Sequence, residues 1–169
     1  MVPTELGGDD TVMETQDILD TFRGACPDHT FDAQTIPVDE TVIEVPAVCL
    51  KRIVACLGSA LSISHLSTIT GQDTGTELEL LYHFWSAGGL TLRVVLPYDD
   101  ARIDSLTDTI PGADFYEREI AEMLHVRFEG HPRAGLTEAD GFEHFLLPED
   151  WRPGRPPLRK KQAPRENET

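Results

Sequence analysis

Residues 78–96 have the sequence LELLYHFWSAGGLTLRVVL. Apolar side chains occupy every second position on both sides of the central SAGG segment: Leu78, Leu80, Tyr82 and Phe84, then Leu90, Leu92, Val94 and Leu96. A β-strand directs alternate side chains to the same face, and a short Gly-rich link favours a tight reversal of the chain. The pattern therefore predicts a β-hairpin with one buried face, around which the rest of the domain is arranged.

Two helices are predicted before this hairpin, each with one apolar stripe. The first begins at Thr11, which forms a capping box with Glu14, and stops at Gly24. The second begins at Pro46 and stops before Gly58, because proline favours the first turn and glycine the position after the last. The stripes recur at helical spacing: Ile18, Leu19 and Phe22 in the first helix, and Leu50, Ile53, Val54 and Leu57 in the second.

Three further strands and a third helix complete the predicted domain. The strands cover residues 31–36, 41–45 and 61–70, the first two joined by a turn and the third closed by a turn at 71–75. A second capping box, Asp114 with Glu117, begins a helix that ends at Leu124. We therefore predict an α+β fold: a two-layer domain with a mixed sheet of about five strands, in the order α-β-β-α-β-β-β-α, and an extended C-terminal tail.

The sequence has the length of one domain with two irregular ends. Residues 1–10 are Gly-rich and acidic and are predicted to be disordered, residues 11–130 form the α+β domain, and residues 131–169 form an extended, partner-binding tail rich in proline. No apolar run reaches the roughly 18 to 20 residues that a membrane span needs. The three cysteines, Cys26, Cys49 and Cys56, form no C-x-x-C pair, so we expect no cysteine-bound cluster or zinc, and Cys49 and Cys56 to pack in the core.

The charge is strongly negative and unevenly distributed. The formal net charge is −16, yet residues 152–169 hold 6 basic and 2 acidic residues, so the tail carries +4 and residues 1–151 carry −20. An acidic body repels phosphate backbones and anionic lipids, so neither nucleic-acid binding nor direct adsorption to a membrane is expected. Adaptation to salt is another source of such acidity.

A series of short motifs between Asp114 and Lys161 carries more specific information. They are FYERE at 115–119, ML at 123–124, VRFEGHP at 126–132, LPEDW at 147–151 and PLRK at 157–160. In this order they resemble the 30-kDa subunit family of respiratory complex I, whose relatives also serve in energy-converting membrane-bound [NiFe] hydrogenases. The predicted order of helices and strands also matches the fold that the resemblance implies.

Three features depart from the family pattern. Residues 133–146 form a longer polar link than usual, and His125 stands where many members have glycine after the helix. Histidine tolerates the left-handed conformation better than most residues, so we expect His125 to adopt it. The last motif continues as Lys160-Lys161 instead of the Lys-Asp usual in respiratory members, which leaves the choice between complex I and hydrogenase open.

The resemblance implies a non-catalytic structural subunit in the peripheral arm of an oxidoreductase, on the cytoplasmic side of the cell membrane. It would pack against the large, 49-kDa-like subunit that houses the quinone site or the [NiFe] site, and against the adjacent iron-sulfur subunit. Electrons from NADH, ferredoxin or an F420-type donor would pass through those subunits, coupled to ion translocation. We expect this protein to bind no cofactor, since it contains no G-x-G-x-x-G motif, P-loop or set of cluster ligands.

Eight residues are the candidates for the partner interface: Glu117, Arg118, Glu119, His131, Trp151, Arg155, Arg159 and Lys160. The first three belong to one helical turn, where they could merely cap the helix and form i,i+4 pairs such as Arg118 with Asp114 or Glu122. Alternatively, Arg118 or Glu119 meets an opposite charge on a partner.

The other candidates also have two interpretations each. His131 lies in a predicted turn, where it could bond backbone carbonyls or serve in metal binding or proton transfer. Trp151 is either an aromatic anchor on a partner or folds back on its own domain. The basic residues Arg155, Arg159 and Lys160 either follow an acidic groove of a neighbour or only increase solubility.

Two other functions are compatible with the sequence. A metal-dependent enzyme could use His125, His131 and His144 with Glu129 or Glu143, although these spacings fit no helical H-x-x-x-H arrangement. A free-standing binding module would instead recognise an acidic partner through its basic tail, and would stay outside membrane fractions.

Overall fold

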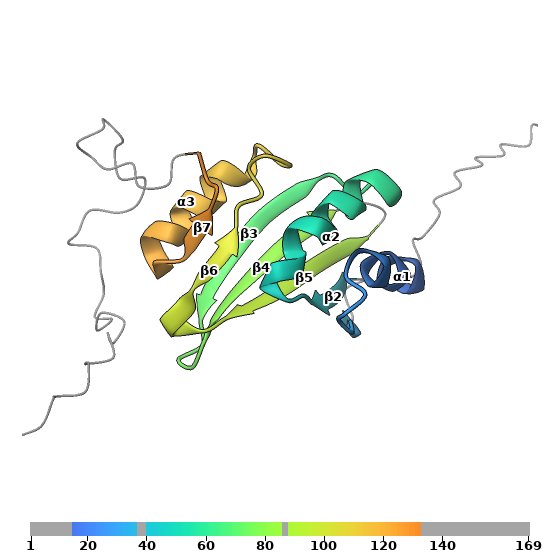
Figure 1. The fold of residues 1–169 in the computed structure, drawn as a ribbon, viewed down its shortest axis with the longest axis horizontal. Helices are drawn as coiled ribbons and strands as arrows, with labels where there is room; N and C mark the ends of the chain where they lie inside the picture. The colour runs from blue at the N-terminus through green and yellow to red at the C-terminus, as the bar shows by residue number, and fades with distance from the viewer. Residues whose placement is uncertain (1–14, 37–39, 86–87, 133–169) are drawn as a thin grey trace, which may run out of the picture.

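A five-stranded mixed sheet forms the centre of the domain (Figure 1). The computed structural model of the protein describes residues 15–36, 40–85 and 88–132. The strands are β1 (Ala33–Ile36), β2 (Glu40–Glu44), β3 (Leu66–Asp73), β4 (Leu78–Trp85) and β5 (Gly89–Leu96). Their order across the sheet is β1-β2-β5-β4-β3; the β2–β5 pair is parallel and the other pairs are antiparallel. The predicted α+β class and mixed sheet are therefore confirmed.

The hairpin of β4 and β5 has the predicted register and burial. Tyr82 lies opposite Leu92 and Trp85 lies opposite Gly89. All eight of the alternating apolar side chains are buried: Leu78, Leu80, Tyr82, Phe84, Leu90, Leu92, Val94 and Leu96. They form one side of the hydrophobic core, and the buried side chains of the helices form the other.

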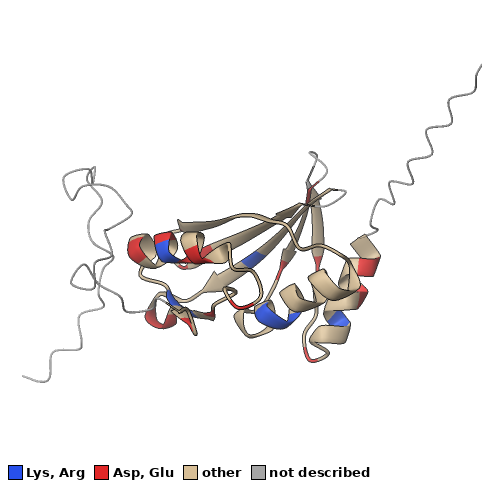
Figure 2. Ribbon diagram, turned by 90° about the horizontal axis from the view of Figure 1, so that it is seen from above, with Lys and Arg blue, Asp and Glu red and all other residues tan. Residues whose placement is uncertain are grey.

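Three helices lie on one side of the sheet, as Figure 2 shows: α1 (Thr15–Ala25), α2 (Ala47–Ala60) and α3 (Ala113–Leu124). The predicted stops at Gly24 and Gly58 were wrong, because both glycines lie inside their helices. Glycine costs only about 1 kcal/mol in a helix, which the burial of Phe22 and Leu57 outweighs. The predicted capping box at Thr11 lies outside the described residues. None of the helices in the described part of the protein combines the length and apolarity that crossing a bilayer requires.

Gly71 does not begin a turn, as the sequence suggested, but lies within β3. A Cβ atom added to Gly71 would lie 2.7 Å from Cδ1 of Leu124 and 3.3 Å from the side chain of Ile120. The missing side chain therefore lets α3 pack closely on this strand. The reversal between β3 and β4 occurs later, at Gly75, whose φ is +90°.

Two short strands were not predicted. β6 (Arg102–Asp104) and β7 (Arg127–Glu129) form a separate parallel pair, preceded by a 3₁₀ turn, η1 (Tyr98–Asp100). α3 connects β6 to β7, so the three elements form a compact β-α-β unit. The position of α3 is thereby set at both of its ends.

The two cysteines of α2 differ in burial. Cys49 is fully buried in the core, as predicted, and Cys26 joins it there, whereas Cys56 is only partly buried. Packing of Cys49 in the core is therefore confirmed, while Cys56 lies at its margin.

Candidate functional site

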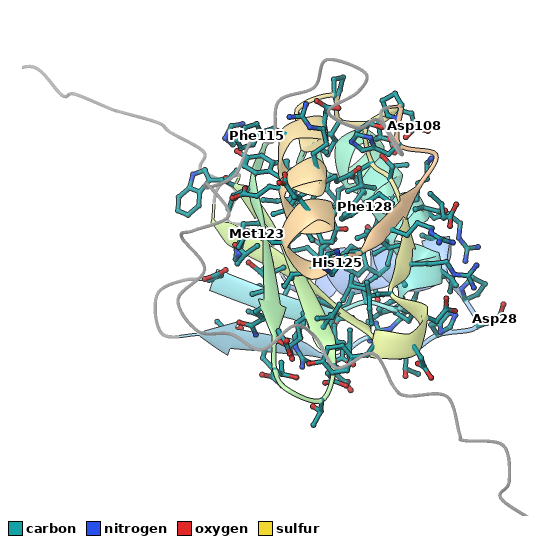
Figure 3. The ribbon with its side chains drawn as sticks, turned by 90° about the vertical axis from the view of Figure 1, so that its left-hand side faces the viewer. Asp28, Asp108, Phe115, Met123, His125 and Phe128 are labelled. Atoms are coloured by element: carbon teal, nitrogen blue, oxygen red, sulfur yellow. The ribbon has the colours of Figure 1, made fainter. Side chains whose placement is uncertain are left out.

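The motif-bearing helix α3 has a buried side and an exposed side. Ala113, Glu117 and Ile120 are buried, whereas Phe115 and Met123 are 44% and 58% exposed. Figure 3 shows the side chains of Phe115 and Met123 projecting to the same side of the helix. A glutamate on the buried side and large apolar side chains on the exposed side are both unusual, and each needs an explanation.

The carboxylate of Glu117 is enclosed within the domain. Its side chain has no exposed surface, Ser105 Oγ donates to Oε2 at 2.6 Å, and the N–H of Leu106 donates to Oε1 at 2.7 Å. A carboxylate is stable away from water only when hydrogen bonds replace its hydration. Glu117 therefore joins α3 to the segment that follows β6.

This position corrects two expectations from the sequence. Glu117 does not form a capping box with Asp114, because the helix begins one residue earlier and the carboxylate turns inward to residues 105 and 106. A contact of Glu117 with a partner protein is also not supported, because its own domain surrounds it. Ser105 and Leu106 were missed altogether.

His131 closes the same cluster from the other end of the β-α-β unit. Its Nε2 lies 3.4 Å from Oδ1 of Asp114 and 4.0 Å from Oε2 of Glu117, and its side chain is almost completely buried. Its ring therefore faces two carboxylates of α3, while its own backbone N–H donates to the carbonyl of Phe128. His131 connects the end of β7 to the start of α3.

Burial dominates the electrostatics of this cluster. It raises the pKa of Glu117, with smaller contributions from Asp114 and Asp108, against the opposing effect of the hydrogen bonds from Ser105 and Leu106. Burial also raises the pKa of the Tyr82 hydroxyl well above its ordinary value, and the charge of Glu117 adds to this shift. Ionisation of Glu117 and of Tyr82 is therefore less favourable in the folded state than in the unfolded state.

The raised pKa of Glu117 predicts a pH dependence of stability. Between the ordinary glutamate value of 4.5 and the higher pKa in the fold, the folded state binds more protons than the unfolded state. The contribution of Glu117 to stability is therefore full below pH 4.5 and decreases as pH rises through the folded pKa. Glu117→Gln should remove this decrease.

Urea midpoints measured from about pH 4 to pH 8 test this prediction, since the slope with pH reports the difference in bound protons. Glu122→Gln, at an exposed position of the same helix, is the matched control. Equal slopes for wild type and Glu117→Gln would contradict the prediction.

Arg118 and Glu119 lie toward the surface, and both are partly buried. Nη1 of Arg118 lies 3.8 Å from Oδ2 of Asp114, so the predicted i,i+4 pair is confirmed. His125 has the predicted left-handed conformation, with φ of 58°, and ends the helix. Four other candidates, Trp151, Arg155, Arg159 and Lys160, lie outside the described residues.

The described residues of the alternative metal site are not grouped together. His125 is exposed at the end of α3, whereas His131 is buried in the cluster with Asp114 and Glu117. Within residues 15–36, 40–85 and 88–132, no three His, Cys, Asp or Glu side chains are grouped so that they could hold a metal ion. His144 and Glu143 lie outside these ranges.

Known proteins resemble this one over most of its length. The family described as "Respiratory-chain NADH dehydrogenase, 30 Kd subunit" matches residues 43–168. The C subunit of NADH-quinone oxidoreductase from Roseiflexus sp. (strain RS-1) is 30% identical over 159 residues, which cover 88% of this chain and 83% of the relative. The C subunit of F(420)H(2) dehydrogenase from Methanosarcina mazei is 29% identical over 157 residues, covering 88% of this chain and 91% of the relative.

Some relatives are much longer than the region they share. The C subunit of NADH-quinone oxidoreductase from Acidothermus cellulolyticus is 40% identical over 87 residues, which cover 50% of this chain and 41% of the relative. For the corresponding protein of Nocardioides sp., the matched region covers only 31% of the relative. The match therefore spans less than half the length of these two proteins.

Two solved structures share the fold. The trypsin-resistant fragment (1-134) of Nqo5 has a TM-score of 0.59 at 24% identity, covering 71% of this chain and 98% of the fragment. A component of the membrane-bound sulfane sulfur reductase, an archaeal respiratory membrane complex, has a TM-score of 0.60 at 22% identity. The match covers 72% of this chain and 74% of that component. With the family match over residues 43–168, the protein belongs to the family of the 30-kDa subunit of respiratory-chain NADH dehydrogenase.

Proposed function

We propose that this protein is a non-catalytic structural subunit of the peripheral arm of a complex I-like oxidoreductase. In this role it packs against the large quinone-site subunit and the adjacent iron-sulfur subunit, on the cytoplasmic side of the membrane. The iron-sulfur clusters and the quinone site belong to those partners, and so does the choice between NADH and an F420-type donor. Family membership supports this role.

The exposed side of α3 is the observation that carries the proposal. Phe115 and Met123 are the large exposed apolar side chains of this helix, and Glu119 lies between them at i,i+4 spacing from each. Large apolar side chains exposed on a surface often mark a protein interface, and a charge buried among them there needs a complementary group on the partner. Glu119, with Arg118 beside it, is therefore our candidate for an ionic contact with the large subunit.

The buried cluster supports this contact indirectly. Glu117 and His131 connect α3 to the segments before and after it, so the helix presents its exposed side in one orientation. A preorganised surface loses less conformational freedom on binding. In this proposal Glu117 and His131 position the interface, while Trp151, Arg155, Arg159 and Lys160 extend it along the partner.

The direct test is a pull-down of the tagged, natively expressed protein from gently solubilised membranes, with partners identified by mass spectrometry. A large subunit with a quinone-site sequence, beside proton-pump subunits, is the expected result. A large subunit with paired C-x-x-C nickel ligands would instead place the protein in a membrane-bound [NiFe] hydrogenase. Recovery of the tagged protein alone, from the soluble fraction, would contradict the proposal.

Glu119→Lys should reduce recovery of the large subunit in this pull-down by about tenfold or more, because placing like charges together in an interface costs several kcal/mol. Asp28→Lys makes the same charge change at an exposed position far from α3, as Figure 3 shows, and should leave recovery unchanged. Equal recovery with both variants would exclude Glu119 from the interface.

A further inference from the structure

One face of the sheet is not covered by any described helix. The three helices of the described residues lie on the other side, where the core is (Figure 2). Side chains that alternate with the core residues of β4 and β5, among them Trp85, His83 and Arg93, therefore point away from the helices. A sheet that is packed on one face only leaves the second face available.

The uncovered face carries two rows of linked polar side chains. In the first row, the guanidinium of Arg93 donates to both Glu44 and Glu79. In the second row, the hydroxyl of Thr91 donates to Glu40 and lies 2.7 Å from Nδ1 of His83. The three carboxylates and one guanidinium of these two rows sum to −2 when His83 is uncharged; the side chain of Glu44 is 63% exposed, whereas that of Glu79 is only 10% exposed. These interactions hold the acidic groups in place across β2, β5 and β4.

A large apolar side chain lies at the end of the same face. Trp85, the last residue of β4, is 62% exposed, and its neighbour across the hairpin is Gly89, which offers no side chain to cover it. An indole exposed to this degree is costly in water and common at the centre of interfaces.

The uncovered face continues toward the exposed side of α3. The hydroxyl of Tyr116 donates to the carbonyl of Ser67 in the edge strand β3, and its ring makes an edge contact with Phe115. In Figure 3, Phe115 and Met123 point away from the side of the sheet that α2 covers. The apolar side chains of α3 and the acidic sheet face can therefore be covered by one partner.

Charge decides which partner fits. Two copies of this protein placed face to face would bring like charges together, which disfavours a homodimer through this surface. We propose that the uncovered sheet face is a docking surface for a basic region of a neighbouring subunit, in which lysine or arginine side chains surround an apolar recess that receives Trp85. This inference rests on the proposed function and identifies a second part of the interface.

Hydroxyl-radical footprinting of Trp85 tests the inference without any substitution. Oxidation of Trp85, measured by mass spectrometry on its own peptide, should be several-fold slower in the assembled membrane complex than in the isolated full-length protein. Equal oxidation in both samples would overturn the inference. The inference would also be overturned if oxidation were slow in the isolated protein and became fast after deletion of residues 133–169. In that case the protein's own basic segment, and not a neighbouring subunit, would occupy the face.

Two variants of the tagged protein, purified with its complex, give an independent test. Glu44→Lys and Trp85→Ala should each lower recovery of one neighbouring subunit, by about tenfold for Glu44→Lys. For wild type, that subunit should also be lost as the salt concentration rises, since screening weakens exposed charge contacts. Asp28→Lys is the control for charge, and urea midpoints verify that each variant is folded.

The outcomes separate this inference from the proposed function. If the tagged wild-type protein recovers no oxidoreductase subunit, the proposed function fails. If it recovers a complete set that neither Glu44→Lys nor Trp85→Ala diminishes, the proposed function stands and the docking surface is refuted.

Discussion

Glu117→Ala is expected to lower the free energy of unfolding by about 3–5 kcal/mol, because it removes a buried acceptor and leaves a cavity. The N–H of Leu106 and the hydroxyl of Ser105 are themselves buried and would lose the carboxylate that accepts from both. The His131 ring would also lose one of the two carboxylates that it faces. Several internal interactions therefore disappear with this one side chain.

Urea unfolding of the isolated protein measures this loss. Glu117→Gln should lower the free energy of unfolding by less than Glu117→Ala does. The amide oxygen of glutamine still accepts one hydrogen bond, and its side chain has nearly the same volume as that of glutamate. Glu122→Ala, on the exposed side of the helix, should change stability by no more than about 0.5 kcal/mol. If Glu117→Ala also lowered the free energy of unfolding by no more than about 0.5 kcal/mol, the cluster would not stabilise the fold.

Deletion of residues 147–169 is expected to abolish assembly while the domain stays folded. Among the residues that the structure describes, the hydrophobic core extends from Ile18 to Phe128, and all of these residues precede the deleted segment. It removes Trp151 and the basic residues Arg155, Arg159 and Lys160. Loss of a single aromatic anchor typically costs about 2 kcal/mol or more, which is about 30-fold in affinity, and the lost charges add to this.

Thermal unfolding and the membrane pull-down together measure the effect of this deletion. Removing only residues 162–169 keeps every candidate contact and is the matched control. A sharply lower melting temperature would show that the deleted segment belongs to the core of its own domain. Full recovery of partners would show that it contributes nothing to assembly.

The elements that were predicted correctly are those with a local pattern. Alternation indicated the hairpin of β4 and β5, and i,i+4 spacing indicated the pair of Arg118 with Asp114. β6 and β7 have three residues each, too few for a period to show. They pair with each other only after the chain has crossed back through α3. Neither segment alone has a sequence pattern that indicates this pairing.

Glu117 and Gly71 were misinterpreted because their roles depend on distant residues. A glutamate three residues after an aspartate fits a capping box, yet its partner Ser105 lies twelve residues away. A signal was nevertheless present: Ala113, Glu117, Ile120 and Leu124 share one helical stripe, in which Glu117 is the only polar member. Gly71 likewise fits a turn until the close approach of Leu124 is known.

The parallel pairing of β2 with β5 affects how the nascent protein leaves the ribosome. β2 ends at Glu44, but the strand that completes its hydrogen bonds begins only at Gly89, and β4 and β3 are added on the far side of that strand. At about 5–20 residues per second, synthesis of the intervening segment lasts several seconds. During that time β1 and β2 form an isolated two-stranded ribbon, which has little stability of its own and exposes an unpaired edge. Until β5 emerges, the edge of β2 is therefore open to pairing with another strand.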